Sequence, residues 1–122
     1  MIRFRWLTAA VLPAVLALGG CGSGSGDLVT RTAEEFTAAV GSGAGDRACE
    51  LLTERAREDV ECSSLDLPGG SVESVEVWGD AAQVRTSEDV LFLRELSSGW
   101  RVAAAGCTAR GDRPYACEVG GP

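Results

Sequence analysis

Five cysteines carry the most reactive side chains of this chain: Cys21, Cys49, Cys62, Cys107 and Cys117. A cysteine can act as a nucleophile, bind a metal or form a disulfide. The sequence of 122 residues has no histidine, which excludes Ser–His–Asp sites, Cys–His sites and imidazole metal ligands. It also lacks a Cys-x-x-Cys spacing. The cysteines therefore favour covalent attachment and cross-linking over redox or metal chemistry.

The first of them, Cys21, stands directly after a segment typical of an export signal. Arg3 and Arg5 give this segment a positive start, an apolar run follows over residues 6–18, and small residues close it. The apolar run is short for a membrane span. This favours cleavage before Cys21 over the alternative of an uncleaved N-terminal anchor helix.

The residues around the expected cleavage point, Leu18-Gly19-Gly20-Cys21, resemble the lipobox of bacterial lipoproteins. The resemblance implies cleavage by the lipoprotein signal peptidase and a diacylglycerol thioether on Cys21. Several acyl chains on one residue anchor a protein stably where a single chain is marginal. The resemblance thus implies a lipoprotein on the extracytoplasmic face of the cell membrane. Residues 1–20 would be its signal peptide and the Gly/Ser-rich residues 21–27 a flexible tether.

The mature chain would be strongly acidic. Loss of Arg3 and Arg5 from the 11 basic residues leaves nine against 18 acidic ones, which changes the net charge from −7 to −9. Such a charge disfavours nucleic acid and anionic lipid headgroups as partners. We therefore expect no nucleic-acid partner, and contact with the membrane through the lipid on Cys21.

Assigning Cys21 to the lipid leaves four cysteines, and four cysteines allow three disulfide connectivities. We favour the pairing that is local in sequence, Cys49–Cys62 and Cys107–Cys117. The second disulfide would close residues 107–117 into a C-terminal loop. Each disulfide contributes about 2–4 kcal/mol to stability by restricting the unfolded chain.

Apolar spacing predicts helices in the first half of the domain. A stripe of helical period over residues 27–41 predicts the first helix. The stripe consists of Val29, Ala33, Phe36 and Val40. Two shorter helices are expected after it, capped by Asp46 and Thr53 and ending near Cys62.

From residue 72 onward the apolar period changes to two, which predicts β-strands. Four strands are expected, over residues 72–78, 81–87, 90–96 and 100–106. Two-residue turns would join them into an antiparallel meander. The expected turns are Gly79-Asp80, Glu88-Asp89 and Ser98-Gly99.

These turns define a register. They place Val75 opposite Val84, Val84 opposite Leu93, and Leu93 opposite Ala104, and opposed residues share a face. One face then collects Val75, Val77, Val84, Leu91, Leu93, Trp100, Val102 and Ala104. We expect helices from residues 28–62 to cover this face of a sheet over residues 72–106. Together with the loop 107–117 they form a single α+β domain, residues 28–122.

Three short motifs fit this order of elements: Gly45-Asp46 before a helix, Gly79-Asp80 with Ala81-Ala82-Gln83-Val84, and Gly99-Trp100-Arg101-Val102. With them, roughly residues 28–106 resemble the cystatin-like/NTF2-like superfold, most closely that of small actinobacterial (Streptomyces-like) secreted lipoproteins. The resemblance implies two to three N-terminal helices packed on one face of a four-stranded meander. The superfold hosts enzymes, binders and scaffolds, so it implies no particular function.

The opposite face of the sheet carries aromatic and basic side chains, namely Trp78, Arg85, Phe92, Arg94 and Arg101. Aromatic residues and arginine are enriched in the central parts of protein interfaces. We therefore identify a candidate interaction face for an envelope protein or a second copy of the chain. The alternative is that the C-terminal loop, with Pro114 and Tyr115, folds over this face and buries the rings.

Two other features could carry chemistry, and each has a structural explanation. Glu95 falls on the helix-covered face, where an apolar pocket would raise the pKa of its carboxyl and suit it to acid–base catalysis. No second catalytic group accompanies it, so we expect Glu95 at a strand end in contact with water. Arg110-Gly111-Asp112 resembles integrin-binding loops, but Gly-Asp followed by Pro114 is also a turn sequence.

Taken together, the sequence predicts a non-enzymatic, lipid-anchored binding module of the cell envelope. We expect no catalytic residue, no cofactor and no metal site. The alternative is a small-molecule-binding protein or carboxylate-dependent enzyme with an NTF2-like pocket, in which Glu95 would be the acid or base.

Overall fold

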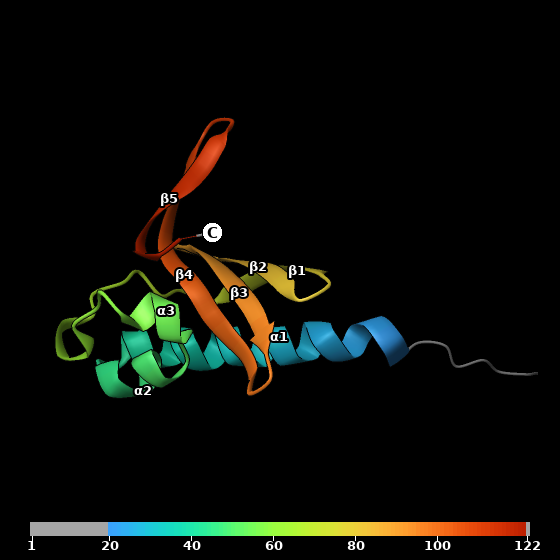
Figure 1. The fold of residues 1–122 in the computed structure, drawn as a ribbon, viewed down its shortest axis with the longest axis horizontal. Helices are drawn as coiled ribbons and strands as arrows, with labels where there is room; N and C mark the ends of the chain where they lie inside the picture. Colours follow the sequence, from blue (N-terminus) through green and yellow to red (C-terminus); the bar gives the residue numbers. More distant parts are fainter. Residues whose placement is uncertain (1–19, 122) are drawn as a thin grey trace, which may run out of the picture.

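The computed structural model describes residues 20–121. Helices come first in the chain and strands follow (Figure 1). The helices are α1 (Gly20–Gly41), α2 (Gly45–Glu50), α3 (Glu54–Arg57) and the 3₁₀ helix η1 (Cys62–Ser64). The strands are β1 (Val72–Trp78), β2 (Ala81–Thr86), β3 (Val90–Leu96), β4 (Gly99–Arg110) and β5 (Arg113–Gly120). The predicted α+β class with N-terminal helices is confirmed.

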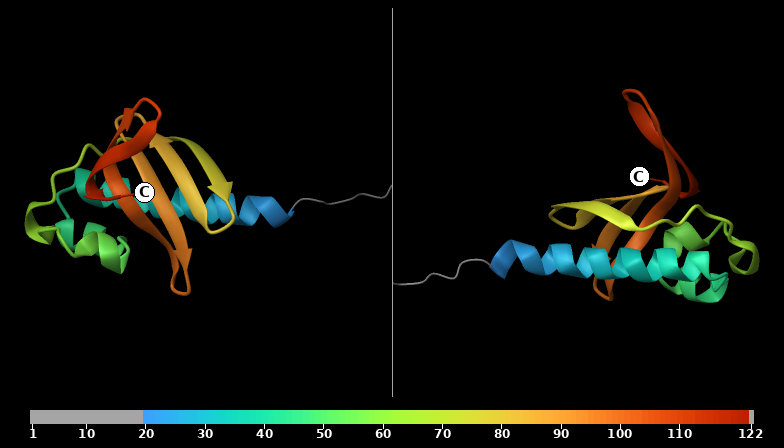
Figure 2. Two further views of the ribbon diagram at one scale, coloured as in Figure 1. Left: turned by 45° about the horizontal axis from the view of Figure 1, so that its top comes forward. Right: turned by 180° about the vertical axis from the view of Figure 1, so that it is seen from behind.

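The five strands form one antiparallel sheet in the order β1-β2-β3-β4-β5. Helix α1 runs along one face of this sheet, with α2 and α3 near its C-terminal end (Figures 1 and 2). We call the face turned away from α1 the outer face. The β4–β5 hairpin rises from one side of the outer face and projects from the body of the domain (Figure 1).

Helix α1 is held against the sheet by the apolar stripe that the sequence predicts. Val29, Ala33 and Phe36 are buried, Ala39 joins them, and Val40 is half-buried against the same cluster. The helix contacts β1, β2 and β4. Burying large apolar side chains such as Phe36 contributes about 1.5–3 kcal/mol each.

The start of α1 differs from the expected flexible tether over residues 21–27. The backbone is helical from Gly20, so the helix includes the Gly/Ser segment. Thr30 Oγ1 donates a hydrogen bond to the Gly26 carbonyl over 2.8 Å. Glycine costs about 1 kcal/mol per residue relative to alanine in a helix, so the Gly/Ser segment is the least stable part of α1. No helix within residues 20–121 is long and apolar enough to cross a membrane.

A disulfide fastens α2 to η1. Cys49 and Cys62 are bonded, as expected, and their Cα atoms lie 5.9 Å apart. The Thr53 hydroxyl accepts a hydrogen bond from Ala56 N over 3.1 Å and caps α3, also as expected. The predicted third helix is shorter than expected, since α3 ends at Arg57 and η1 begins only at Cys62. Asp46 lies inside α2 and does not cap it.

The strand register agrees with expectation for β1–β2 and differs by two residues elsewhere. Val75 lies opposite Val84, but Leu93 lies opposite Ala82 and Val102. Both turns occur one residue earlier than expected, at residues 87–88 and 97–98. At the first turn Thr86 Oγ1 accepts from Asp89 N over 2.7 Å, and Thr86 N donates to the Asp89 carbonyl over 2.9 Å.

A shift of two residues leaves every side chain on its original face of the sheet. The residues predicted for the core face therefore still share that face, although their partners on neighbouring strands differ. The residues Val84, Leu91, Leu93, Trp100 and Val102 are buried, and Val75 and Val77 are half-buried against them. Ala104 is also buried, but it does not lie on the predicted face. A bulge in β4 places it opposite Phe92, and Ala105 takes its place in the core cluster.

The predicted four-stranded sheet is wrong in strand count, because residues 107–117 form a hairpin instead of an irregular loop. β4 continues past residue 106 to Arg110, and β5 returns antiparallel to it. Cys107 lies directly opposite Cys117 and the two are bonded, as expected. Gly111 has a φ of +68° at the two-residue turn, a conformation that glycine adopts without strain.

Candidate functional site

The candidate interaction residues Trp78, Arg85, Phe92, Arg94 and Arg101 lie together on the outer face. Trp78 is opposite Ala81, Ala81 is opposite Arg94, and Arg94 is opposite Arg101. Phe92 pairs with Gln83, two positions along the same face. Antiparallel pairing therefore brings side chains from four strands into one surface.

Two large apolar side chains of this surface are open to solvent. Trp78 is 55% exposed and Leu96 is 42% exposed. Both line an open groove of about 900 Å³, together with Phe92 and Arg94. A tryptophan exposed in a groove offers a large apolar contact area, which is the usual basis of an interface hot spot.

The C-terminal hairpin covers one part of the outer face and leaves another part open. The ring of Tyr115 on β5 meets the ring of Phe92 edge to face, with centroids 5.1 Å apart and planes at 71°. Both residues are half-buried. The expected cover by the C-terminal segment is therefore found over Phe92 and is not found over Trp78.

The three arginines of the face differ in what they contact. Arg94 Nη2 lies 3.7 Å from Asp80 Oδ2, and both side chains are more than half exposed. Such an exposed pair contributes at most about 1 kcal/mol, so Arg94 can exchange this partner for another. Arg101 Nη1 donates a hydrogen bond to the Trp100 carbonyl over 2.8 Å. Arg85 is exposed near the C-terminal end of β2.

Three carboxylates also line this groove, and the sequence patterns do not predict them as site residues. Glu58 and Asp59 follow α3, and Glu118 lies on β5. All three are exposed, and none of them takes part in an ion pair with another described residue. In the sequence, Glu58 and Asp59 have the pattern of a solvated helix face, and Glu118 lies beyond the last predicted strand. Only the packing of α3 against β5 brings these segments together.

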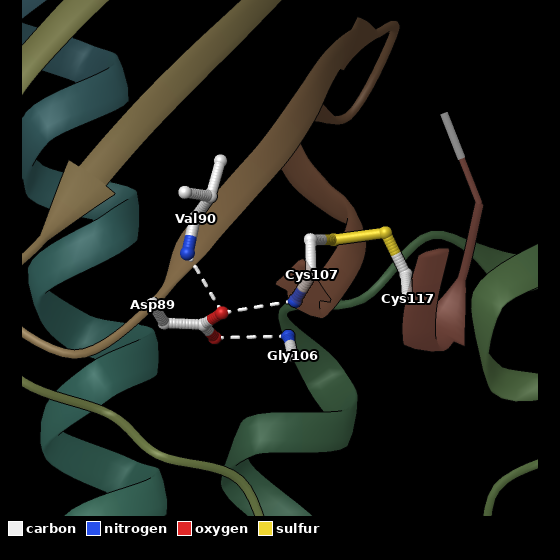
Figure 3. The surroundings of a disulfide bond; sticks show 5 residues. All are labelled: Asp89, Val90, Gly106, Cys107 and Cys117. Atoms are coloured by element: carbon white, nitrogen blue, oxygen red, sulfur yellow. Dashed lines mark hydrogen bonds between the residues drawn. A yellow bond between two sulfur atoms is a disulfide. The ribbon is translucent and has the colours of Figure 1, made fainter. Parts of the chain in front are cut away.

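Asp89 is a buried carboxylate with a structural role. Its Oδ1 accepts hydrogen bonds from Val90 N over 2.7 Å and Cys107 N over 3.0 Å, and its Oδ2 accepts one from Gly106 N over 2.9 Å (Figure 3). Three backbone donors compensate the burial of the charge. The residue thus ties the β2–β3 turn to the base of the projecting hairpin, next to the Cys107–Cys117 disulfide.

The remaining candidates lie outside the groove. Glu95 is exposed at the end of β3, opposite Trp100, and does not line the groove. Arg110, Gly111 and Asp112 are exposed at the tip of the hairpin. Within the described part of the chain, no group of three acidic or cysteine side chains is arranged to hold a metal ion. The side chain of Cys21, the expected lipid attachment site, lies outside the described residues.

Comparison of this chain with protein-family models, with curated proteins and with solved structures found no match.

Proposed function

We propose that this protein is a lipid-anchored lipoprotein of the cell envelope whose folded domain is a non-enzymatic binding module. The partner is a membrane or envelope protein that docks in the groove of the outer face. The observation that carries this proposal is the 55% exposure of Trp78 at the end of a groove of about 900 Å³. Large exposed apolar patches are uncommon on monomers and mark interaction sites.

The anchor and the fold family belong to the same proposal. The lipobox-like Leu18-Gly19-Gly20-Cys21 supports lipidation of Cys21 on the extracytoplasmic side. Helices packed on one face of an antiparallel sheet support a cystatin-like/NTF2-like relationship. The catalytic alternative has weaker support, because Glu95 is exposed to solvent near the end of β3 and does not line the groove.

Lipidation is tested by the intact mass of the protein extracted from membranes. We expect a chain that begins at Cys21, carries a diacylglycerol group with or without an amide-linked acyl chain, and is four hydrogens lighter than the reduced form. The Cys21→Ser variant is the control, and its intact mass should show no lipid and an uncleaved segment over residues 1–20. A free thiol on Cys21 in the wild-type protein would contradict the proposed location.

Partner binding is tested by site-specific photo-cross-linking in the producing cell. A photoreactive amino acid at Leu96 lies in the groove, and a matched one at Glu34 lies on the exposed side of α1. We expect a discrete protein adduct from position 96 that disappears with Trp78→Ala, and none from position 34. Equal labelling at both positions, or none at position 96, would argue against a docking groove.

A further inference from the structure

The groove has two chemically different ends. Trp78 on β1 and Leu96 at the end of β3 line the side away from β5, together with Arg94, and Phe92 lies under Tyr115 nearer to β5. Glu58, Asp59 and Glu118 make the other end acidic, and Arg55 is the one basic residue that lines that end of the described groove. Because none of the three carboxylates is ion-paired within the described residues, their charges remain available to a ligand.

The dimensions of the groove suit an extended chain. Trp78 on β1 and Ala103 on β4 both line it, and three strand spacings separate their strands. This corresponds to about 14 Å, which about four residues in extended conformation would span. A further one or two residues would reach the carboxylates beyond β4. An occupant of about six residues can therefore contact both ends at once.

We propose that the groove binds an extended peptide segment of a partner protein with apolar side chains at one end and lysine or arginine at the other. This inference rests on the proposed function and specifies its partner. The apolar side chains cover Trp78 and Leu96, and the basic side chains pair with Glu58, Asp59 and Glu118. The net charge of the mature chain, which changes from −7 to −9 with the loss of Arg3 and Arg5, attracts the same kind of segment from a distance.

Charge argues against the other occupants. A second copy of this chain is itself acidic, and the acidic end of the groove would repel it. The same three carboxylates would also repel an acidic peptide or an anionic lipid surface. A basic segment is the occupant whose charge complements the groove.

The test uses the lipidated protein in a non-ionic detergent and two synthetic hexapeptides. Both peptides begin with the same alternating leucine–threonine half, and one ends in three lysines while the other ends in three glutamates. After residue 20 the only tryptophans are Trp78, which is exposed, and Trp100, which is 3% exposed. The change in tryptophan emission on binding therefore reports on Trp78, and the Trp78→Phe variant should abolish it.

We expect the lysine peptide to bind and the glutamate peptide not to bind. The triple variant Glu58→Gln, Asp59→Asn, Glu118→Gln should lower the affinity for the lysine peptide about tenfold, as expected for the loss of several exposed ion pairs. The matched control is Asp66→Asn, Glu73→Gln, Glu88→Gln. This control also removes three negative charges, but from exposed positions that do not line the groove. It should change the affinity for the lysine peptide less than about twofold.

Equal binding of the two peptides, or equal effects of the two triple variants, would overturn the inference. So would tryptophan emission that changes with protein concentration alone, because a second copy would then occupy the groove. If the lysine peptide fails to bind while position 96 still cross-links to a partner, the basic segment is wrong and the docking groove stands. If isothermal titration calorimetry, which does not depend on Trp78 emission, shows equal binding to the Trp78→Ala variant, the groove is not the site and both proposals fail.

Discussion

Asp89 Oδ2 accepts a hydrogen bond from Gly106 N over 2.9 Å, and this contact joins two parts of the chain that are 17 residues apart. The carboxylate lies at the β2–β3 turn, and the glycine lies where β4 leaves the main sheet for the hairpin. The Asp89 side chain therefore helps to fix the orientation of the hairpin, and with it the position of Tyr115 over Phe92.

We expect Asp89→Asn to lower the free energy of unfolding by about 1–3 kcal/mol. An amide oxygen can accept the hydrogen bonds of Val90 and Cys107, but the amide nitrogen would face the Gly106 donor and leave it unsatisfied. Urea denaturation followed by circular dichroism measures the loss. Asp112→Asn, at the exposed hairpin tip, is the control and should have no effect. Equal stability of the two variants would contradict the assigned role.

Gly45→Ala should destabilise the helical end of the domain. A Cβ at this position would collide with the Cys62 carbonyl, which the Cys49–Cys62 disulfide holds in place. We expect a loss of about 1–3 kcal/mol, typical of overpacking. Gly41→Ala is the matched control, because a Cβ there meets open space, and it should be neutral or slightly stabilising. Thermal unfolding of the oxidised protein distinguishes the two.

Removing the Cys107–Cys117 disulfide should loosen the hairpin and spare the main sheet. Two strands alone are marginally stable in water, and residues beyond the disulfide pair only with each other. In Cys107→Ser/Cys117→Ser we expect fast amide hydrogen exchange over residues 108–116 and retained protection in β2 and β3. Loss of protection throughout the sheet would show that the disulfide supports the whole fold.

The Phe92–Tyr115 contact should be measurable as a coupling energy. A double-mutant cycle of Phe92→Ala and Tyr115→Ala should give about 0.5–1.5 kcal/mol, the range for aromatic pairs in edge-to-face geometry. Tyr115→Phe keeps the ring and should retain the wild-type stability. A coupling energy near zero would mean that the two rings do not hold the hairpin to the outer face.

Trp78→Ala should separate binding from stability. The side chain is 55% exposed, so its removal should change the free energy of unfolding by no more than about 0.5 kcal/mol. Cross-linking from position 96 and peptide binding should both be lost. A large drop in stability would instead assign Trp78 to the structure of the sheet.

The sequence predicts which residues form the core better than it predicts which residues are opposite one another. Val84 and Leu93 are buried on the face expected for them, although Leu93 is opposite Ala82 instead of Val84. Burial depends on alternation along a strand, which a sequence displays directly. Pairing depends on where a turn begins, and here the Thr86 hydroxyl selects residues 87–88 for the turn.

The fifth strand and the acidic end of the groove show a second limit of prediction from sequence, namely that local patterns do not reveal contacts between distant segments. Pro114 and the short disulfide spacing favour a loop in the sequence, yet the opposed Cys107 and Cys117 support a ladder on both sides of the bond. Glu58 and Glu118 are 60 positions apart and become neighbours of one groove only after α3 packs on β5. Local patterns cannot show such long-range proximity.

With a lipid on Cys21, the helical start of α1 would set the height and orientation of the domain above the bilayer. Val29 is the first fully buried side chain among those described, so residues 20–28 extend α1 beyond the packed body. Residues 21–28, which follow the expected cleavage point, form a helical spacer about 12 Å long. With a lipid on Cys21, such a spacer would restrict the groove to a narrow range of heights. Partners whose basic segment lies within that layer would then be selected by distance as well as by charge.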